Sequence, residues 1–130
     1  KNLSKNYGLE KNIFWSDTIA NDLKWGAITA SSGMALSSHG ENFGVALVES
    51  LRCSRPVLTT YKVNIYKDIL KSNAGFISKD NSNDFAKILN KFSKLNKTQK
   101  NQLSINAYNC FKKNFNLSKG KNNLVKLLKK

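Results

Sequence analysis

The sequence predicts an α/β fold with a doubly wound parallel sheet, and three observations support this. Short apolar or β-branched segments alternate along the chain with longer segments whose apolar residues recur at helical spacing. The strand candidates are apolar on both faces, as strands are when helices cover both sides of a sheet. Successive strands are separated by helix-length segments, and such crossovers are almost always right-handed, so the strands should run parallel.

The expected elements follow this alternation in chain order. Strands are expected at 12–15, 34–38, 57–60 and 75–78. Helices are expected between them at 19–31, 43–53 and 64–71, the last capped by Asn64. Three further helices are expected: one opening within 80–84 and reaching Leu95, one capped by Thr98 and reaching Phe111, and one around 124–128. These C-terminal helices form extra layers around a single domain.

The apolar stripes of these helices are interpreted as core, and nothing from Phe85 onward indicates chemistry. Trp15 and Trp25 are likewise assigned to packing. At 130 residues, with 40% apolar and 10% aromatic residues, the chain can build a core without disulfides or a structural metal.

Localisation is predicted from the absence of membrane and export signals. No apolar run approaches the ~20 residues of a membrane span, and the first ten residues, KNLSKNYGLE, are too polar for a signal peptide. We therefore expect a cytoplasmic protein. The chain does not begin with Met, which suggests a fragment of a longer protein.

The metal-binding residue types are few. Cys53 and Cys110 are far apart, and together with His39 they match no known zinc-ligand spacing. We expect two reduced, buried thiols and no metal site.

The net charge of +14 requires an explanation. No acidic residue follows Asp84, whereas twelve lysines do. This excess could indicate a nucleic-acid-binding protein, but only Arg52 and Arg55 are arginines, the residue type that makes most bidentate contacts to bases and phosphates. We interpret most of the charge as solvated helix faces and expect no nucleic acid. Contact with anionic lipid at the inner membrane face stays open.

One strand-to-helix turn carries an unusual set of functional groups. Its sequence, SSHGENFGVALVE, spans residues 37–49. Backbone N–H groups from Phe43 to Ala46 would face out of the helix start and, with the helix dipole, form a phosphate site. Glu41 and Glu49 would lie about 12 Å apart at ~1.5 Å per residue. That is too far for the paired acid–base chemistry of a glycosidase. The spacing suits two carboxylates that hydrogen-bond the hydroxyls at opposite ends of one ligand, with a phosphate between them.

The stretch SSHGENFGVALVESLRCSRPVLTTYKVNIYKDI resembles the donor-binding core of family 4 glycosyltransferases, which have the two-domain GT-B fold. In that family a Ser- or His-containing turn precedes Glu-x-Phe-Gly, a second Glu after seven intervening residues, and Pro-Val at the next strand. Glu41, Phe43-Gly44, Glu49 and Pro56-Val57 match in that order. The upstream GLEKNIFWSDTI also resembles the family's entry, so the resemblance covers most of the chain.

The resemblance implies that residues 1–130 form the Rossmann-like, donor-binding, C-terminal half of a GT-B enzyme. It further implies retaining transfer of a glycosyl group from a nucleoside-diphosphate sugar, with no metal or cofactor. Glu41 would be catalytic, near the reacting carbon, and Glu49 would bind the ribose hydroxyls. The implied donor-binding residues are His39, Asn42, Phe43, Gly44, Val45, Ala46 and Glu49.

The sequence departs from the family pattern at several positions. Ser54 replaces a common glycine, Arg52 is bulky, and Tyr61-Lys62-Val63-Asn64 replaces a Gly-Gly pair. The donor and the subgroup therefore stay open. The family's phosphate-binding Arg and Lys, together with the N-terminal domain that binds a sugar or lipid-linked acceptor, would precede residue 1. We therefore expect weak donor binding and no transfer by this chain alone.

Three alternatives remain beside a glycosyltransferase of polysaccharide assembly. An inactive nucleotide-binding module would bind nucleotide even without Glu41. A basic protein that binds nucleic acid or membrane surfaces would lose affinity with salt and ignore Glu49. A sugar-nucleotide 2-epimerase shares the two-domain architecture, but the Glu-x-Phe-Gly turn fits it less well.

Overall fold

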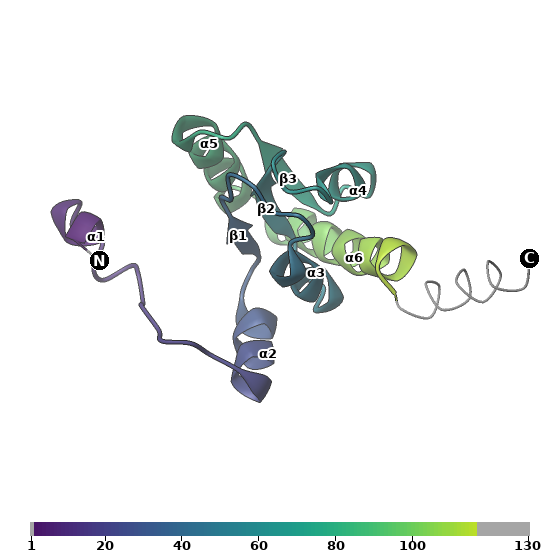
Figure 1. Cartoon of the computed structure of the whole chain (residues 1–130), viewed down its shortest axis with the longest axis horizontal. Helices are drawn as coiled ribbons and strands as arrows, with labels where there is room; N and C mark the ends of the chain where they lie inside the picture. Colours follow the sequence, from purple (N-terminus) through teal and green to yellow (C-terminus); the bar gives the residue numbers. More distant parts are fainter. Residues whose placement is uncertain (1, 117–130) are drawn as a thin grey trace, which may run out of the picture.

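The computed structural model describes residues 2–116 as an open parallel sheet with helices on both faces (Figure 1). The elements in chain order are α1 (Asn2–Asn6), α2 (Asn21–Ala30), β1 (Met34–Leu36), α3 (Val45–Arg52), β2 (Val57–Thr60), α4 (Tyr66–Lys71), β3 (Gly75–Ser78), α5 (Ser82–Ser93) and α6 (Lys97–Asn114). The expected helix around 124–128 lies outside the described residues. Within the described part, no helix is long and apolar enough to cross a membrane.

The sheet has the order β1-β2-β3, and both strand pairs are parallel. Met34 is in register with Val57, and Val57 with Gly75. All four residues of the central strand β2 are buried. The predicted α/β class and the parallel strand direction are therefore confirmed.

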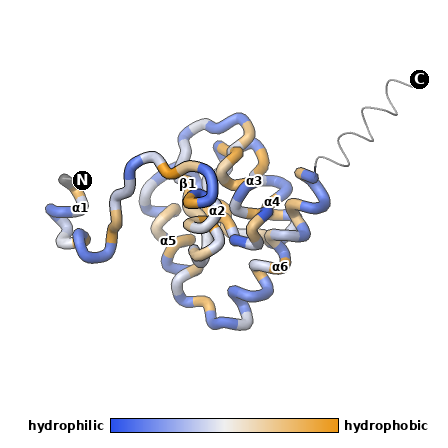
Figure 2. Tube along the Cα trace, turned by 90° about the horizontal axis from the view of Figure 1, so that it is seen from below, coloured by the Kyte–Doolittle hydropathy of each residue, from blue (hydrophilic) through white to orange (hydrophobic). Residues whose placement is uncertain are grey.

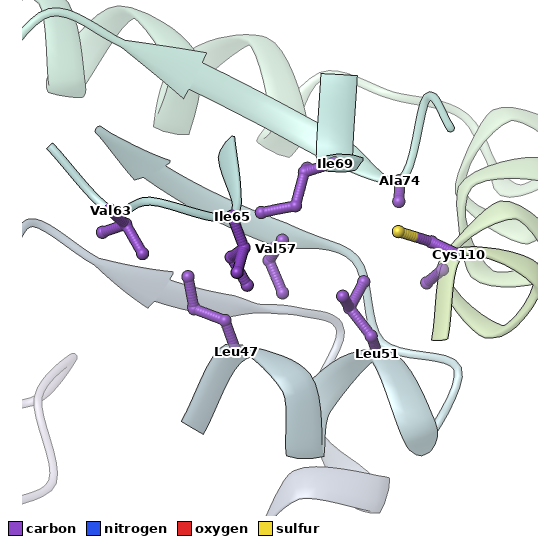
Figure 3. Close-up of a cluster of buried hydrophobic side chains, with 9 residues drawn as sticks. Leu47, Leu51, Val57, Val63, Ile65, Ile69, Ala74 and Cys110 are labelled. Carbon is purple, nitrogen blue, oxygen red and sulfur yellow. The ribbon is translucent and has the colours of Figure 1, made fainter. Parts of the chain in front are cut away.

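The helices α3 to α6 form two layers, one on each face of the sheet. In two perpendicular views, α3, α4 and α6 lie on one side of the strands and α5 on the other (Figures 1 and 2). The main core lies between the sheet and the first layer, where α6 adds Ala107 and Cys110 (Figure 3). The second face is less complete, because α5 packs on β2 and β3 while Ala35 of β1 is exposed. The core residues are Leu47, Leu51, Val57, Val63, Ile65, Ile69, Ala74, Ala107 and Cys110.

Side-chain caps fix the starts of the two longest helices. Asn81 accepts a hydrogen bond from the Asp84 N–H at the start of α5. At the start of α6, Asn96 and Gln99 form a reciprocal capping box. The predicted cap at Thr98 is therefore wrong, since Asn96 already satisfies the first free N–H groups of the helix. Asn64 is also not a cap, because α4 begins two residues later without a side-chain cap.

The expected strand at 12–15 is absent, and this prediction was wrong. The segment is irregular, with Phe14 92% and Trp15 53% exposed. A strand is stable only when a neighbouring strand takes up its backbone N–H and C=O groups, and the described sheet does not extend to this segment. The chain begins instead with α1, which Gly8 follows at φ +66°, and α1 lies away from the sheet (Figure 1).

Candidate functional site

The turn between β1 and α3 is held in place by hydrogen bonds to the end of β2 and to the loop that follows it. Thr60 donates its hydroxyl proton to the Ser38 carbonyl at 2.7 Å. The Glu41 N–H donates to the Lys62 carbonyl at 3.3 Å, and the Asn64 N–H donates to the Glu41 carbonyl at 3.2 Å. The backbone of Glu41 is thus fixed at both its donor and its acceptor, while its side chain is exposed.

Gly44 sets the start of α3. It adopts the left-handed conformation, φ +67° and ψ +55°, and its carbonyl accepts from the N–H groups of Leu47 and Val48. The N–H groups of Val45 and Ala46 have no hydrogen-bond partner among residues 2–116. These two donors sit at the positive end of the helix dipole, which is the arrangement that binds anions.

Glu49, halfway along α3, forms an ion pair that sequence reasoning missed. Lys24 of α2 donates from Nζ to Glu49 Oε1 at 2.6 Å, with the two side chains 34% and 22% exposed. Two cations lie near the ring of Trp25: Lys24 Nζ is 4.7 Å and Arg52 Cζ 5.3 Å from the ring centroid. A solvent-accessible pair of this kind contributes about 0–1 kcal/mol, so ligand hydroxyls can compete for the carboxylate.

Beside Glu49 lies a cavity of about 570 Å³ between α2, α3 and α6. This volume is within the range of ligand sites. Phe43, 50% exposed, packs edge-on against Phe115 with ring centroids 6.0 Å apart. Trp25, assigned to packing from the sequence, lines the cavity as well. The full lining is Trp25, Phe43, Val48, Glu49, Arg52, Phe111, Phe115 and Asn116.

A second cavity, of about 280 Å³, lies at the carboxyl ends of the strands on the α5 side of the sheet. His39 reaches it from the turn after β1, and Asp80 from the end of β3. His39 Nδ1 and Asp80 Oδ1 are 2.6 Å apart. The lining residues are Ser37, His39, Thr60, Asp80, Asn81, Ser82, Phe85, Ala86 and Leu89.

The structure therefore divides the predicted site residues between two cavities and the turn that separates them. His39 lines the smaller cavity, and Phe43 and Glu49 line the larger one. The other predicted residues lie on the intervening turn and the start of α3 and line neither cavity: Glu41, Asn42, Gly44, Val45 and Ala46. Asp80 also lines the smaller cavity. The sequence analysis expected this residue at the start of a helix but did not predict that it belongs to a site.

Metal-binding groups do not gather in the part of the chain that the structure describes: no three His, Cys, Asp or Glu side chains lie close enough to hold an ion. Cys53 and Cys110 are free thiols, but only Cys110 is buried.

Among the described residues, the pKa of one carboxyl group departs from its ordinary value. Hydrogen bonds from Lys87 and then Asn81 lower the pKa of Asp84 below its ordinary value of 3.8. Asp84 itself lines neither cavity.

The parallel sheet, its two helix layers and the turn after β1 define one α/β half of the GT-B class of glycosyltransferases. The family model for the glycosyl transferases group 1 matches residues 1–110, and the chain belongs to this family. The resemblance inferred from the Glu-x-Phe-Gly turn is thereby confirmed.

A solved structure and curated relatives agree with this assignment. The sucrose-phosphate synthase of Thermosynechococcus elongatus superimposes with a TM-score of 0.85 at 16% identity, over 98% of this chain and 32% of that one, which shows a shared fold. Curated relatives described as serotype-specific mannosyltransferase WbdA of Escherichia coli are 28% identical over 79 residues, which is 61% of this chain. The chain spans only 9–10% of the length of those relatives.

Proposed function

We propose that this chain binds the nucleoside-diphosphate sugar donor of a retaining glycosyltransferase. The observation that carries the proposal is the start of α3, where the unpaired N–H groups of Val45 and Ala46 lie in sequence between Glu41 and Glu49. A diphosphate needs such donors, and sugar and ribose hydroxyls need carboxylate acceptors on either side of it.

Each group has a distinct role in the proposal. The N–H groups of Val45 and Ala46, with the dipole of α3, hold diphosphate oxygens and stabilise the negative charge that develops as the diphosphate departs. Glu49 accepts hydrogen bonds from the ribose diol in competition with Lys24, and Glu41 lies near the reacting carbon of the sugar. The proposal requires neither a metal ion nor a cofactor.

In this proposal, acceptor binding belongs to a part of the protein other than residues 1–130. A sugar or lipid-linked acceptor would bind an N-terminal domain, so residues 1–130 alone bind donor weakly and catalyse no transfer. The mannosyltransferase relatives support a place in polysaccharide assembly. The protein would act in the cytoplasm, with an anionic membrane surface as a partner of its lysine-rich C-terminal half.

The proposal is tested by NMR titration of the chain with UDP, GDP and ADP at two salt concentrations. Wild type is compared with Glu49→Gln and with Glu10→Gln, which removes the same charge from an exposed position outside the turn. Chemical shifts should change within residues 38–49 and favour one base. Glu49→Gln should weaken binding about tenfold, because the ribose loses charge-assisted hydrogen bonds, whereas Glu10→Gln should bind like wild type.

A different outcome would contradict the proposal. Shift changes confined to the lysine-rich α6, equal for the three nucleotides and erased by salt, would mean non-specific anion binding. Nucleotide binding that survives both Glu49→Gln and Glu41→Gln unchanged would likewise exclude the assigned roles.

A further inference from the structure

His39 and Asp80 meet across the carboxyl edge of the sheet, although 41 positions separate them in the sequence. The first follows β1 and the second follows β3, and the carboxyl ends of parallel strands share one edge. The 2.6 Å distance between His39 Nδ1 and Asp80 Oδ1 is that of a short charge-assisted hydrogen bond. His39 is the sole histidine of the chain.

The direction of this hydrogen bond fixes where the imidazole proton lies. A carboxylate can only accept, so Nδ1 of His39 must be the donor. In the neutral ring this leaves Nε2 with a free lone pair. A neutral imidazole in water prefers the opposite arrangement, with the proton on Nε2, so Asp80 reverses the intrinsic preference.

Asp80 is the anchored member of the pair. Its side chain is 17% exposed, whereas that of His39 is 86% exposed. Asp80 directly precedes Asn81, the N-cap of α5, whose positive dipole end favours a carboxylate at this position. Without Asp80, nothing else among the described residues hydrogen-bonds the His39 ring.

We propose that Asp80 is a positioning residue that makes His39 Nε2 a hydrogen-bond acceptor for a hydroxyl of the donor sugar. This inference rests on the proposed function. An Nε2 lone pair can accept from a sugar hydroxyl, but it cannot bind a phosphate oxygen that carries no proton. The cavity that both residues line also offers the hydroxyls of Ser37 and Ser82 and the ring of Phe85. The sugar therefore occupies the 280 Å³ cavity, on the other side of the turn from Glu49.

The tautomer is measured first, without any ligand. Long-range ¹H–¹⁵N correlation spectra at a pH where the ring is neutral give one unambiguous histidine pattern. Wild type should show a protonated Nδ1 and an unprotonated Nε2. Asp80→Ala should shift the proton to Nε2, and the control Asp84→Ala should not, because Asp84 lies in the first turn of α5 but pairs with Lys87. A wild-type ring protonated mainly on Nε2, or a spectrum unchanged in Asp80→Ala, would overturn the proposal.

Ligand affinity is measured second, with UDP against UDP-glucose, GDP against GDP-mannose and ADP against ADP-glucose. Asp80→Ala should weaken the sugar conjugate roughly 3–10-fold, the worth of one hydrogen bond, and leave the diphosphate unchanged. Equal losses for both ligands would overturn the assignment of the sugar. If wild type binds none of the six, the proposed function fails, while the tautomer result still stands on its own.

Discussion

At the scale of single residues, the backbone of Gly44 determines the geometry of the candidate site. Its φ of +67° and ψ of +55° set the direction in which the chain enters α3, and few side-chain-bearing residues adopt this conformation without strain. A Cβ atom at this position would also lie 3.0 Å from Val63 Cγ1 in the core. At Gly40, four residues earlier, an added Cβ atom would have no other atom within 4 Å, and the backbone φ is not positive.

Gly44→Ala should therefore lower the free energy of unfolding by about 1–2 kcal/mol, the cost of a left-handed conformation. Gly40→Ala, the matched control, should change it by less than about 0.5 kcal/mol. Urea denaturation followed by circular dichroism measures both. Equal stability of the two variants would show that the left-handed conformation at Gly44 is not needed.

The helix start near Gly44 could be predicted from the sequence, whereas the caps of α4 and α6 were predicted wrongly and the distant partners of the site residues were not predicted. Gly44 and the helix start after it follow from a turn of a few residues. The partners of Glu49 and His39, which are Lys24 and Asp80, lie 25 and 41 positions away. A sequence indicates that a carboxylate on an apolar helix needs a partner, but not which of the chain's many lysines reaches it.

At the scale of secondary-structure elements, the capping box at the start of α6 illustrates how two side chains determine where a helix begins. Asn96 accepts from the Gln99 N–H at 2.9 Å, and the Gln99 side chain accepts from the Asn96 N–H at 3.0 Å. Both hydrogen bonds use backbone groups that would otherwise be unpaired at the helix end.

Asn96→Ala should destabilise the protein by about 1 kcal/mol. Asn101→Ala is the matched control, because Asn101 is exposed inside the same helix and alanine is the better helix former there. Thermal unfolding should therefore show a lower Tm for the first variant and an unchanged or higher Tm for the second. A Tm for Asn96→Ala equal to that of wild type would mean that solvent caps the helix equally well.

Two of the strands were predicted with their observed bounds, whereas the strand expected at 12–15 is not found. The strands β2 and β3 have the predicted bounds, because each is a short apolar segment flanked by turn residues. Residues 12–15 have a similar composition but pair with no strand of the described sheet. Composition thus shows that a segment can form a strand, whereas pairing decides whether it does.

At the scale of the whole molecule, the net charge of +14 opposes a compact state. Part of the lysine excess is used in packing, since Nζ atoms lie 4.7 Å from the ring centroid of Phe76, for Lys91, and 4.9 Å from that of Tyr108, for Lys112. These contacts support the interpretation of the charge as solvated helix faces whose stems cover apolar surface.

Raising the ionic strength from about 0.01 M to about 0.15 M should increase the Tm, because the screening length falls from about 30 Å to about 8 Å. A Lys97→Gln/Lys113→Gln variant loses two positive charges, which lowers the net charge from +14 to +12, and its Tm should rise less with salt. Differential scanning calorimetry measures both effects. A Tm that falls with salt would mean that attractive ion pairs outweigh the repulsion.

The pairing of each strand with its sequence neighbour has a consequence for how the protein folds. Met34 pairs with Val57, 57 − 34 = 23 positions on, and Val57 pairs with Gly75, 75 − 57 = 18 positions on. Closing such short loops costs little chain entropy, and folding is fast when contacts are local in sequence. The three strands can therefore join one after another in the order in which a ribosome releases them, each addition enclosing only the helix just made.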